Sequence, residues 1–205
     1  MSDTTNASAA PVAKPGDTGR VVSINLSEKK TVRKQRYERG VCVLDRGFEG
    51  DAHAGDWHRQ ISLLAMESID EMVAKGLDVG PGDFAENITT EGIDVMTLPL
   101  GSVLRIGPVV LEISQVGKVC HTKCAIYYQA GDCVMPREGV FAVVREPGEI
   151  VVGDTIELVS IGDGTCDRSP DEAVAESAEV HAANCNKVAA MAEKLEAAAA
   201  AAKEQ

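Results

Sequence analysis

The chain has 205 residues, of which 44% are hydrophobic, and its formal net charge at pH 7 is −12. This length suffices for one hydrophobic core of ordinary size but not for two large ones. The acidic balance argues against nucleic-acid binding, because neutralising phosphates requires clustered cations. Abundant glycine and scarce aromatic residues, in a chain of many short apolar runs, favour a β-rich domain.

Residues 1–18 are rich in Ala, Ser, Thr, Pro and Asp, and we expect them to form a disordered lead. They hold no apolar stretch of signal-peptide length, and the chain has no apolar run of about 18 residues that would span a membrane. We therefore expect a cytoplasmic protein without a membrane partner. In a reducing cytosol, the six cysteines are more often catalytic or metal-binding than cross-linked.

Residues 19–160 form a series of short apolar segments whose lengths and alternation are typical of strands. The expected strands are 20–26, 40–44, 60–65, several segments within 84–116, 140–144, and 149–159 with a turn at Gly153-Asp154. One helix is expected over 66–75, ending at Gly76, and a second short one over 125–129. Seven or more such strands predict a mainly β fold, a closed or nearly closed barrel that leaves few exposed strand edges.

The basic stretch from Lys29 to Arg39 is read in two ways. It is either a solvated hairpin or a rim that attracts phosphate on an otherwise acidic protein.

Residues 161–205 are expected to be a linker and an Ala-rich helix that begins near Ser169-Pro170. A weak heptad spacing follows, but most of its positions are small or polar and would bury little. The main expectation is therefore a solvated tail that is dispensable for folding. The alternative is a helix that binds a partner through Val174, Val188 and Leu195.

The densest group of reactive side chains is GKVCHTKC at 117–124, directly after the predicted strand VVLEISQV. Nearby cations lower the pKa of a thiol and favour the reactive thiolate. Cys120 is therefore the predicted nucleophile or sulfur carrier, activated by Lys118 and His121. The alternatives are a metal site formed with Cys124 and Cys133, or a reversible disulfide between Cys120 and Cys124.

Two further polar segments precede predicted strands. GDAHAGDWHRQ at 50–60 places Asp51, His53 and Arg59 in a candidate binding loop. PGDFAEN at 81–87 places Glu86 and Asn87 where they either bind a polar heterocycle or hold the loop through their own hydrogen bonds.

Taken in order, GDAHAG…HRQISLLA, PGDFAENITTEGI, LPLGSVLRIG and LEISQVGKVCHTKCAI resemble the MOSC domain family, named for the molybdenum cofactor sulfurase C-terminal domain. The resemblance covers about residues 19–160 and implies a β-barrel. The family's cysteine falls on Cys120, its GD-x-H stretch on Asp51 and His53, and its GEN-like stretch on 85–87, with Ala85 where Gly is usual. The chain departs from the family pattern in having Val119 instead of Pro before the cysteine, and in adding the further thiol of Cys124.

The resemblance implies a protein that binds the molybdenum or tungsten cofactor, or that transfers sulfur through Cys120. The implied partners are molybdoenzymes, cofactor-biosynthesis proteins and a cysteine desulfurase. No segment matches the desulfurase domain of the fused sulfurases, so pyridoxal phosphate is not expected in this chain. Two rivals stay open: a non-enzymatic cofactor carrier or metallochaperone, and a zinc- or redox-responsive cysteine module.

Overall fold

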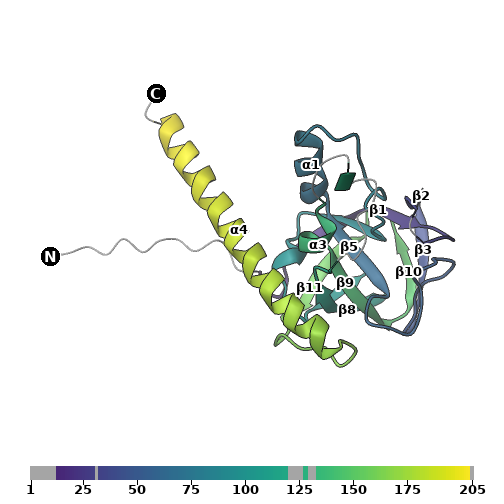
Figure 1. Ribbon diagram of the computed structural model, residues 1–205. Coiled ribbons are helices and arrows are strands. Elements are labelled where there is room, and N and C mark those ends of the chain that lie inside the picture. The colour runs from purple at the N-terminus through teal and green to yellow at the C-terminus, as the bar shows by residue number, and fades with distance from the viewer. Residues whose placement is uncertain (1–12, 31, 120–126, 129–132, 204–205) are drawn as a thin grey trace.

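The computed structural model describes residues 13–30, 32–119, 127–128 and 133–203, and these are mainly β (Figure 1). The strands are β1 (Thr18–Leu26), β2 (Gln35–Tyr37), β3 (Arg39–Val43), β4 (Gly47–Phe48), β5 (Ile61–Ala65), β6 (Ile88–Glu91), β7 (Val103–Ile106), β8 (Val109–Val116), β9 (Val140–Glu146), β10 (Gly148–Val151) and β11 (Thr155–Ser160). The helices are α1 (Met66–Ala74), α3 (Met135–Glu138) and α4 (Asp171–Lys203), with a 3-10 turn, η1 (Val95–Thr97).

Seven strands close into a barrel in the order β11-β7-β8-β9-β5-β6-β1, with β1 pairing back onto β11. Neighbouring strands are antiparallel except for β5 and β6, which are parallel. Strand β2 pairs antiparallel with the end of β1, while β10, β3 and β4 form a small second sheet. The expected closed barrel is thus confirmed, and closure satisfies backbone groups that an open sheet would leave at its edges.

The predicted elements agree with the observed ones to within a few residues. The helix expected over 66–75 is α1, and Gly76 follows it with φ +90°, a backbone conformation that glycine adopts without strain. The turn predicted at Gly153-Asp154 separates β10 from β11. Of the short helix expected over 125–129, Tyr127 and Tyr128 are helical, and the rest lies outside the described residues.

Strand β8 differs from expectation in its burial. Its alternation predicts a half-buried strand, yet seven of its eight residues are buried. The polar residues Ser114 and Gln115 are 0% and 2% exposed, because the segment that leads into α4 and the first turns of α4 cover them. Ser169 Oγ donates a hydrogen bond to the carbonyl of Ser114, and Gln115 Nε2 lies 3.4 Å from Glu176 Oε2.

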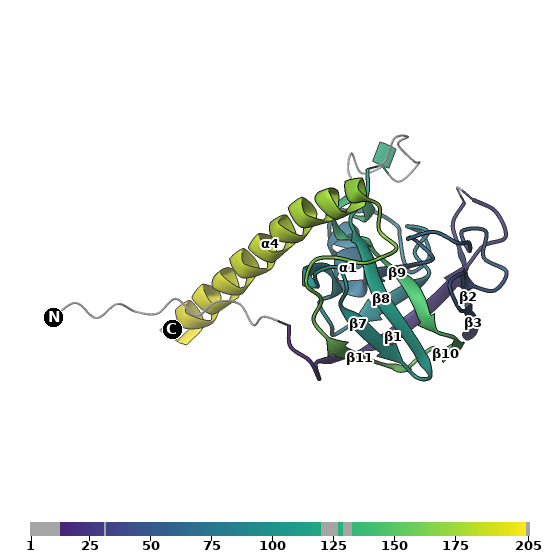
Figure 2. The same cartoon turned by 90° about the horizontal axis from the view of Figure 1, so that it is seen from below.

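The expectation of a solvated C-terminal tail is therefore wrong for the first half of α4. Ala173, Ser177 and Asn184 are buried, and Val174 packs against the barrel core. His181 Nε2 lies 2.9 Å from the carbonyl oxygen of Thr97 in η1. Beyond this docked half, the helix extends away from the barrel (Figures 1 and 2). The heptad pattern failed as a guide because the docking face is mostly polar.

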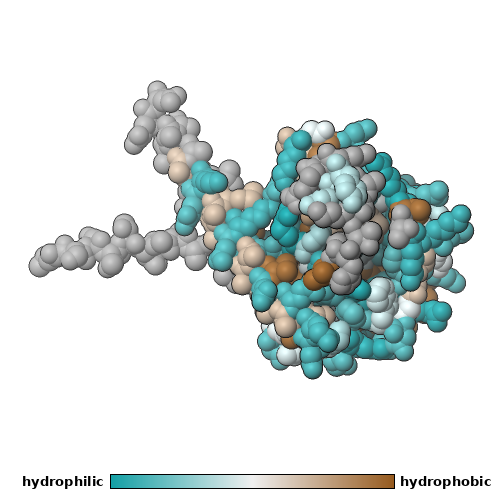
Figure 3. All heavy atoms as spheres, in the orientation of Figure 1, coloured by the Kyte–Doolittle hydropathy of each residue, from teal (hydrophilic) through white to brown (hydrophobic). Residues whose placement is uncertain are grey.

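Among the described residues, no helix has the length and apolar character needed to cross a membrane. The face shown in Figure 3 is mostly hydrophilic, with apolar residues in small separate groups.

Candidate functional site

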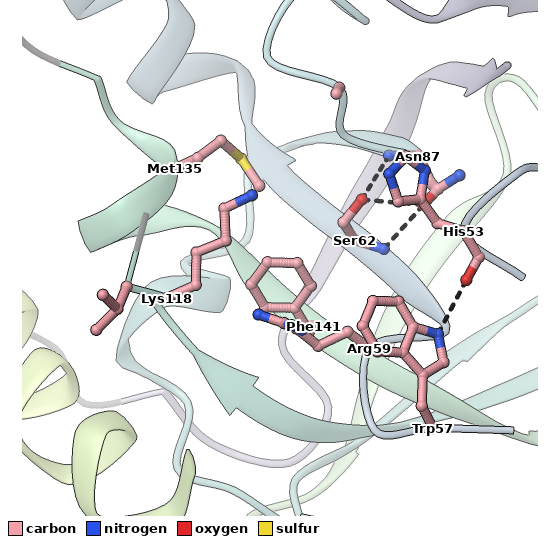
Figure 4. A pocket seen from close by; sticks show the side chains of 10 residues that line it. His53, Trp57, Arg59, Ser62, Asn87, Lys118, Met135 and Phe141 are labelled. Carbon is pink, nitrogen blue, oxygen red and sulfur yellow. Dashed lines mark hydrogen bonds between the residues drawn. The ribbon is translucent and has the colours of Figure 1, made fainter. Parts of the chain in front are cut away.

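A cavity of about 300 Å³ opens beside the paired residues Ser62 of β5 and Phe141 of β9, near the end of β8 and the start of β6 (Figure 4). Its walls come from five parts of the chain: the loop before β5 together with β5, the turn before β6, the segment 118–119 that follows β8, α3, and the start of β9. The lining residues are His53, Trp57, Arg59, Ser62, Ala85, Asn87, Lys118, Val119, Met135 and Phe141.

The cavity is cationic. The guanidinium carbon of Arg59 lies 4.9 Å from the centroid of the Trp57 ring and 5.7 Å from that of Phe141. Lys118 Nζ lies 5.8 Å from the centroid of the same Phe141 ring. Among the described lining residues none is acidic, and no described residue forms an ion pair with Arg59 or Lys118. The buried Nε of Arg59 has no described hydrogen-bond partner, so the cavity presents unsatisfied positive charge in a chain of net charge −12.

Asp51 lies behind the cavity and does not line it. Its fully buried carboxylate accepts hydrogen bonds from Lys34 Nζ at 2.8 and 2.9 Å, and from the backbone N–H of His53 at 3.0 Å. Burial alone would raise the pKa of Asp51, but the neighbouring His53 and the Lys34 ammonium hold it well below its usual range. Any contribution of Asp51 to binding is therefore made through His53, whose Nδ1 lies 3.4 Å from Asp51 Oδ1.

Lys34 corrects the reading of the basic stretch as a solvated hairpin. Its side chain is fully buried, and burial lowers its pKa although Asp51 acts in the opposite direction. Arg33 and Arg36 are used locally as well. The first pairs with Asp83 at 3.3 Å, and the second donates to the carbonyl of Pro81 at 3.1 Å.

Glu86 and Asn87 hold the strands that meet at the cavity. Asn87 Oδ1 accepts hydrogen bonds from Ser62 N and Oγ at 3.1 and 2.9 Å, which ties β6 to β5. Glu86 is fully buried, and its Oε1 accepts a hydrogen bond from Thr89 Oγ1 at 2.9 Å. Burial raises the pKa of Glu86. Asn87 lines the cavity and Glu86 does not.

Ala85 lines the cavity in a strained conformation. Its φ is +64°, in the left-handed region where an L side chain costs about 1–2 kcal/mol. This is the position at which the family resemblance implies Gly. Strain of this kind is maintained only where the surrounding structure compensates it, and it is found preferentially at functional sites.

The predicted cysteine motif is only partly described. Lys118 and Val119 line the cavity, whereas Cys120, His121 and Cys124 lie outside the described residues. Cys133 is buried in the apolar cluster that also contains Met135 and Phe141. The cavity is therefore bounded by the residue that directly precedes Cys120 in the chain.

Three other cysteines are unsuited to nucleophilic chemistry at neutral pH. Burial raises the pKa of Cys42 to about 12, and it also raises the pKa values of Cys166 and Cys185. Cys166 gathers with Glu112 and Asp167, a set with metal-ligand chemistry. The guanidinium of Arg145 already bonds to both carboxylates, so this group is an ion-pair network of the described residues.

Trp57, Ser62, Met135 and Phe141 line the cavity but were not predicted from the sequence. Trp57 is the only tryptophan in the chain, and its position in a polar loop was a usable signal, since an aromatic ring there has no strand face to cover. Met135 and Phe141 carried no such signal. Their neighbours are apolar, and only the closed barrel brings them to His53 and Arg59.

Comparison with known proteins gives one family and several similar folds. The family model described as "MOSC domain" matches residues 50–157, which is more than half of the chain. The crystal structure of the YUAD protein from Bacillus subtilis is similar with a TM-score of 0.60 at 19% identity, over 71% of this chain and 97% of that one. YiiM from Geobacillus stearothermophilus gives 0.56 at 20% identity, over 80% and 84%.

YiiM from Escherichia coli gives a TM-score of 0.52 at 21% identity, covering 76% of each chain. At these identities the likeness concerns the fold. No curated protein matches the sequence significantly.

Proposed function

This chain belongs to the MOSC domain family, and on that premise we propose that it handles the molybdenum or tungsten form of the pterin cofactor. It would bind the cofactor in the cavity or transfer sulfur to it through Cys120. The observation that carries this proposal is the pair of cations, Arg59 and Lys118, in a cavity whose described lining residues include no carboxylate. Such a site favours an anionic ligand, and the cofactor carries a phosphate group.

The residues present fit the chemistry of that cofactor. The Arg59 guanidinium and the Lys118 ammonium suit a phosphate, and the buried Nε of Arg59 is a donor without a described partner. The rings of Trp57 and Phe141 offer flat surfaces for a heterocycle. When bound, the cofactor supplies metal-centred redox and sulfur-ligand chemistry. The chain's own residues bind the anionic end, orient the ring and present a thiol.

Val119 lines the cavity, and Cys120 is the next residue in the chain. In the sulfur-transfer form of the proposal, its thiolate attacks the outer sulfur of a persulfide on a cysteine desulfurase. A new S–S bond forms on Cys120, the donor's S–S bond breaks, and the donor thiolate leaves with the electron pair. In the carrier form, the same thiolate is a metal ligand, and the cofactor passes to a molybdoenzyme or a biosynthetic partner.

The cationic cavity is tested through the fluorescence of Trp57, the sole tryptophan. Iodide should quench Trp57 more strongly than caesium, despite the net charge of −12, because Arg59 stacks on its ring. Arg59→Met should remove this preference. Arg39→Met, which loses the same charge at an exposed site, should keep it. Quenching by caesium equal to or stronger than that by iodide in the unmodified protein would contradict a cationic cavity.

The role of Cys120 is tested by incubating the protein with a cysteine desulfurase and its substrate, and measuring the mass of each variant. Cys120→Ser should fail to gain sulfur or to retain extractable fluorescent pterin, while Cys185→Ser should behave like the unmodified protein. If Cys120→Ser does both normally, the assignment is wrong. Repeated release of sulfurated product identifies a transferase, and a single stoichiometric binding event identifies a carrier.

A further inference from the structure

The docked half of α4 reaches the two segments that form one wall of the cavity. Figures 1 and 2 show the first turns of the helix beside the barrel, and Figure 4 shows Lys118 and Met135 on the same side of the cavity. Lys118 follows β8, and Met135 begins α3. Neither residue lies on a strand of the barrel, so their positions depend on what holds the ends of these two segments.

The first contact fixes the end of β8. Ser177 Oγ accepts a hydrogen bond of 3.1 Å from the backbone N–H of Val116. Next to it, Gly117 has φ +70°, and a Cβ added there would lie 2.8 Å from Val180 Cγ1. The backbone that leads to Lys118 is thus packed tightly against α4.

The second contact fixes α3. Asn184 Nδ2 donates hydrogen bonds to the carbonyl oxygens of Arg137 at 2.7 Å and of Met96 at 3.4 Å. One turn further on, Lys187 Nζ lies 2.8 Å from Glu138 Oε1, a carboxylate that is almost fully buried. The bonds to Arg137 and Glu138 hold α3, the helix that carries Met135.

The two segments are also bonded to each other. The N–H of Lys118 donates to the carbonyl of Pro136 at 3.1 Å, and the N–H of Gly117 donates to the carbonyl of Gly139 at 2.7 Å. The wall with Lys118 and Met135 is therefore one unit, and α4 holds it at both ends.

A third contact leads to the loop that carries Arg59. Gln115 connects α4 to this loop. Its Nε2 is 3.4 Å from Glu176 Oε2 on α4, and its Oε1 is 2.9 Å from His58 Nε2 in the loop. Just before α4, Arg168 pairs with Asp56, the residue that precedes Trp57. Both sides of the cationic cavity are thus tied to the C-terminal segment.

We propose that α4 is a positioning element of the cavity, with Ser177 and Asn184 as its positioning residues. They do not line the cavity themselves, and they act through the backbone of Val116 and Arg137. Their bonds set the distance of the Lys118–Met135 wall from Arg59 and His53. The proposal rests on the proposed function only in taking the cavity as the binding site.

The test compares Asn184→Asp with Asn186→Asp. Both variants add the same charge to the same helix, but Asn184 is buried and Asn186 is exposed. In Asn184→Asp, a carboxylate replaces the donor and faces two carbonyl oxygens. The measurements are amide hydrogen exchange over 115–119 and 135–139 and quenching of Trp57 by neutral acrylamide, both made well below the unfolding temperature.

Asn184→Asp should speed exchange at Gly117, Lys118 and Gly139 by about tenfold or more and change the acrylamide quenching constant. Asn186→Asp should change neither. A lower midpoint of unfolding with unaltered exchange and quenching would show that α4 only stabilises the fold, and would overturn the proposal. Because acrylamide is uncharged, this outcome is independent of the iodide test of the cationic cavity.

If Asn184→Asp does not fold, Lys187→Met replaces it, with Lys194→Met as the matched control on the exposed part of the helix. Removing Lys187 takes away one of the two contacts between α4 and α3 and leaves the Ser177 contact with β8 in place. Faster exchange should then appear at 135–139 before 115–117. Equal exchange in Lys187→Met and Lys194→Met would overturn the proposal.

Discussion

The two walls of the cavity are held in different ways. His53, Ser62 and Asn87 form a wall on β5 and the segments beside it, supported by barrel hydrogen bonds and by the buried Lys34–Asp51 ion pair. Lys118 and Met135 form the opposite wall (Figure 4), supported by a helix that begins more than 30 residues further along the chain.

Because of this difference, one wall mainly determines the stability of the fold, and the other mainly determines the shape of the cavity. The barrel wall contains a buried charge pair, and losing one partner leaves the other charge uncompensated in the interior. The helix wall relies on a few neutral hydrogen bonds, each of which contributes about 1 kcal/mol, and on the ion pair between the partly exposed Lys187 and the almost fully buried Glu138. Damage to the first wall should therefore unfold the protein, and damage to the second should mainly move Lys118.

The largest effect is expected from Asp51→Asn, which removes the only carboxylate bonded to the buried Lys34 among the described residues. Breaking a buried pair in this way costs about 3–5 kcal/mol. Glu149→Gln removes the partner of Arg39 in an exposed pair, and should cost less than about 1 kcal/mol. Urea unfolding of both variants measures the loss of unfolding free energy. Similar losses in the two variants would mean that the Lys34–Asp51 pair stabilises this wall no more than an exposed ion pair does.

The same pair makes a pH dependence. The folded-state pKa of Asp51 lies below the usual value of 3.8, so its stabilising contribution is fully present above that value and is lost as the pH falls further. The stability difference between the unmodified protein and Asp51→Asn should therefore be constant near neutral pH and shrink below about pH 4. If this stability difference instead grew on acidification, the pKa of Asp51 would be raised on folding and not lowered.

Deletion of residues 161–205 should come next in size. It uncovers Ser114 and Gln115 and removes the bonds from Ser177 and Asn184. The thermal midpoint should fall by more than about 5 °C, which for a domain of this size means roughly 1–2 kcal/mol. Deleting only residues 191–205, which leaves the docked half in place, should lower it far less. An unchanged midpoint after the longer deletion would restore the expectation that the tail is dispensable.

The smallest effect is expected from Ala85→Gly. Glycine adopts φ +64° without the steric penalty of a side chain, but it also increases the entropy of the unfolded chain. The net gain should be at most about 1 kcal/mol. Ala54→Gly, in the nearby loop and without positive φ, has only the entropic cost and should destabilise the protein slightly. A loss at Ala85 as large as the loss at Ala54 would show that no strain is relieved there.

The barrel could be predicted because its signals are local. The alternation and spacing of short strands, the turn at Gly153, and Gly76 at the end of α1 each depend on a few neighbouring residues, and the structure agrees with them. The ordered motifs that identified the family are likewise readable in one pass along the chain. They also singled out His53, Arg59, Asn87 and Lys118, all of which line the cavity.

Other features were decided only by tertiary structure. Lys34 looked like one cation of a solvated stretch, and only the folded barrel places it against Asp51 and out of water. Trp57 and Phe141 meet Arg59 although Phe141 lies more than 80 residues away in sequence. The docking of α4 left only a weak hydrophobic periodicity in the sequence, because Ser177 binds a backbone amide, Asn184 binds backbone carbonyls and Lys187 binds a carboxylate. Polar partners of this kind are chosen by position in space, and position in space follows from the closure of the barrel.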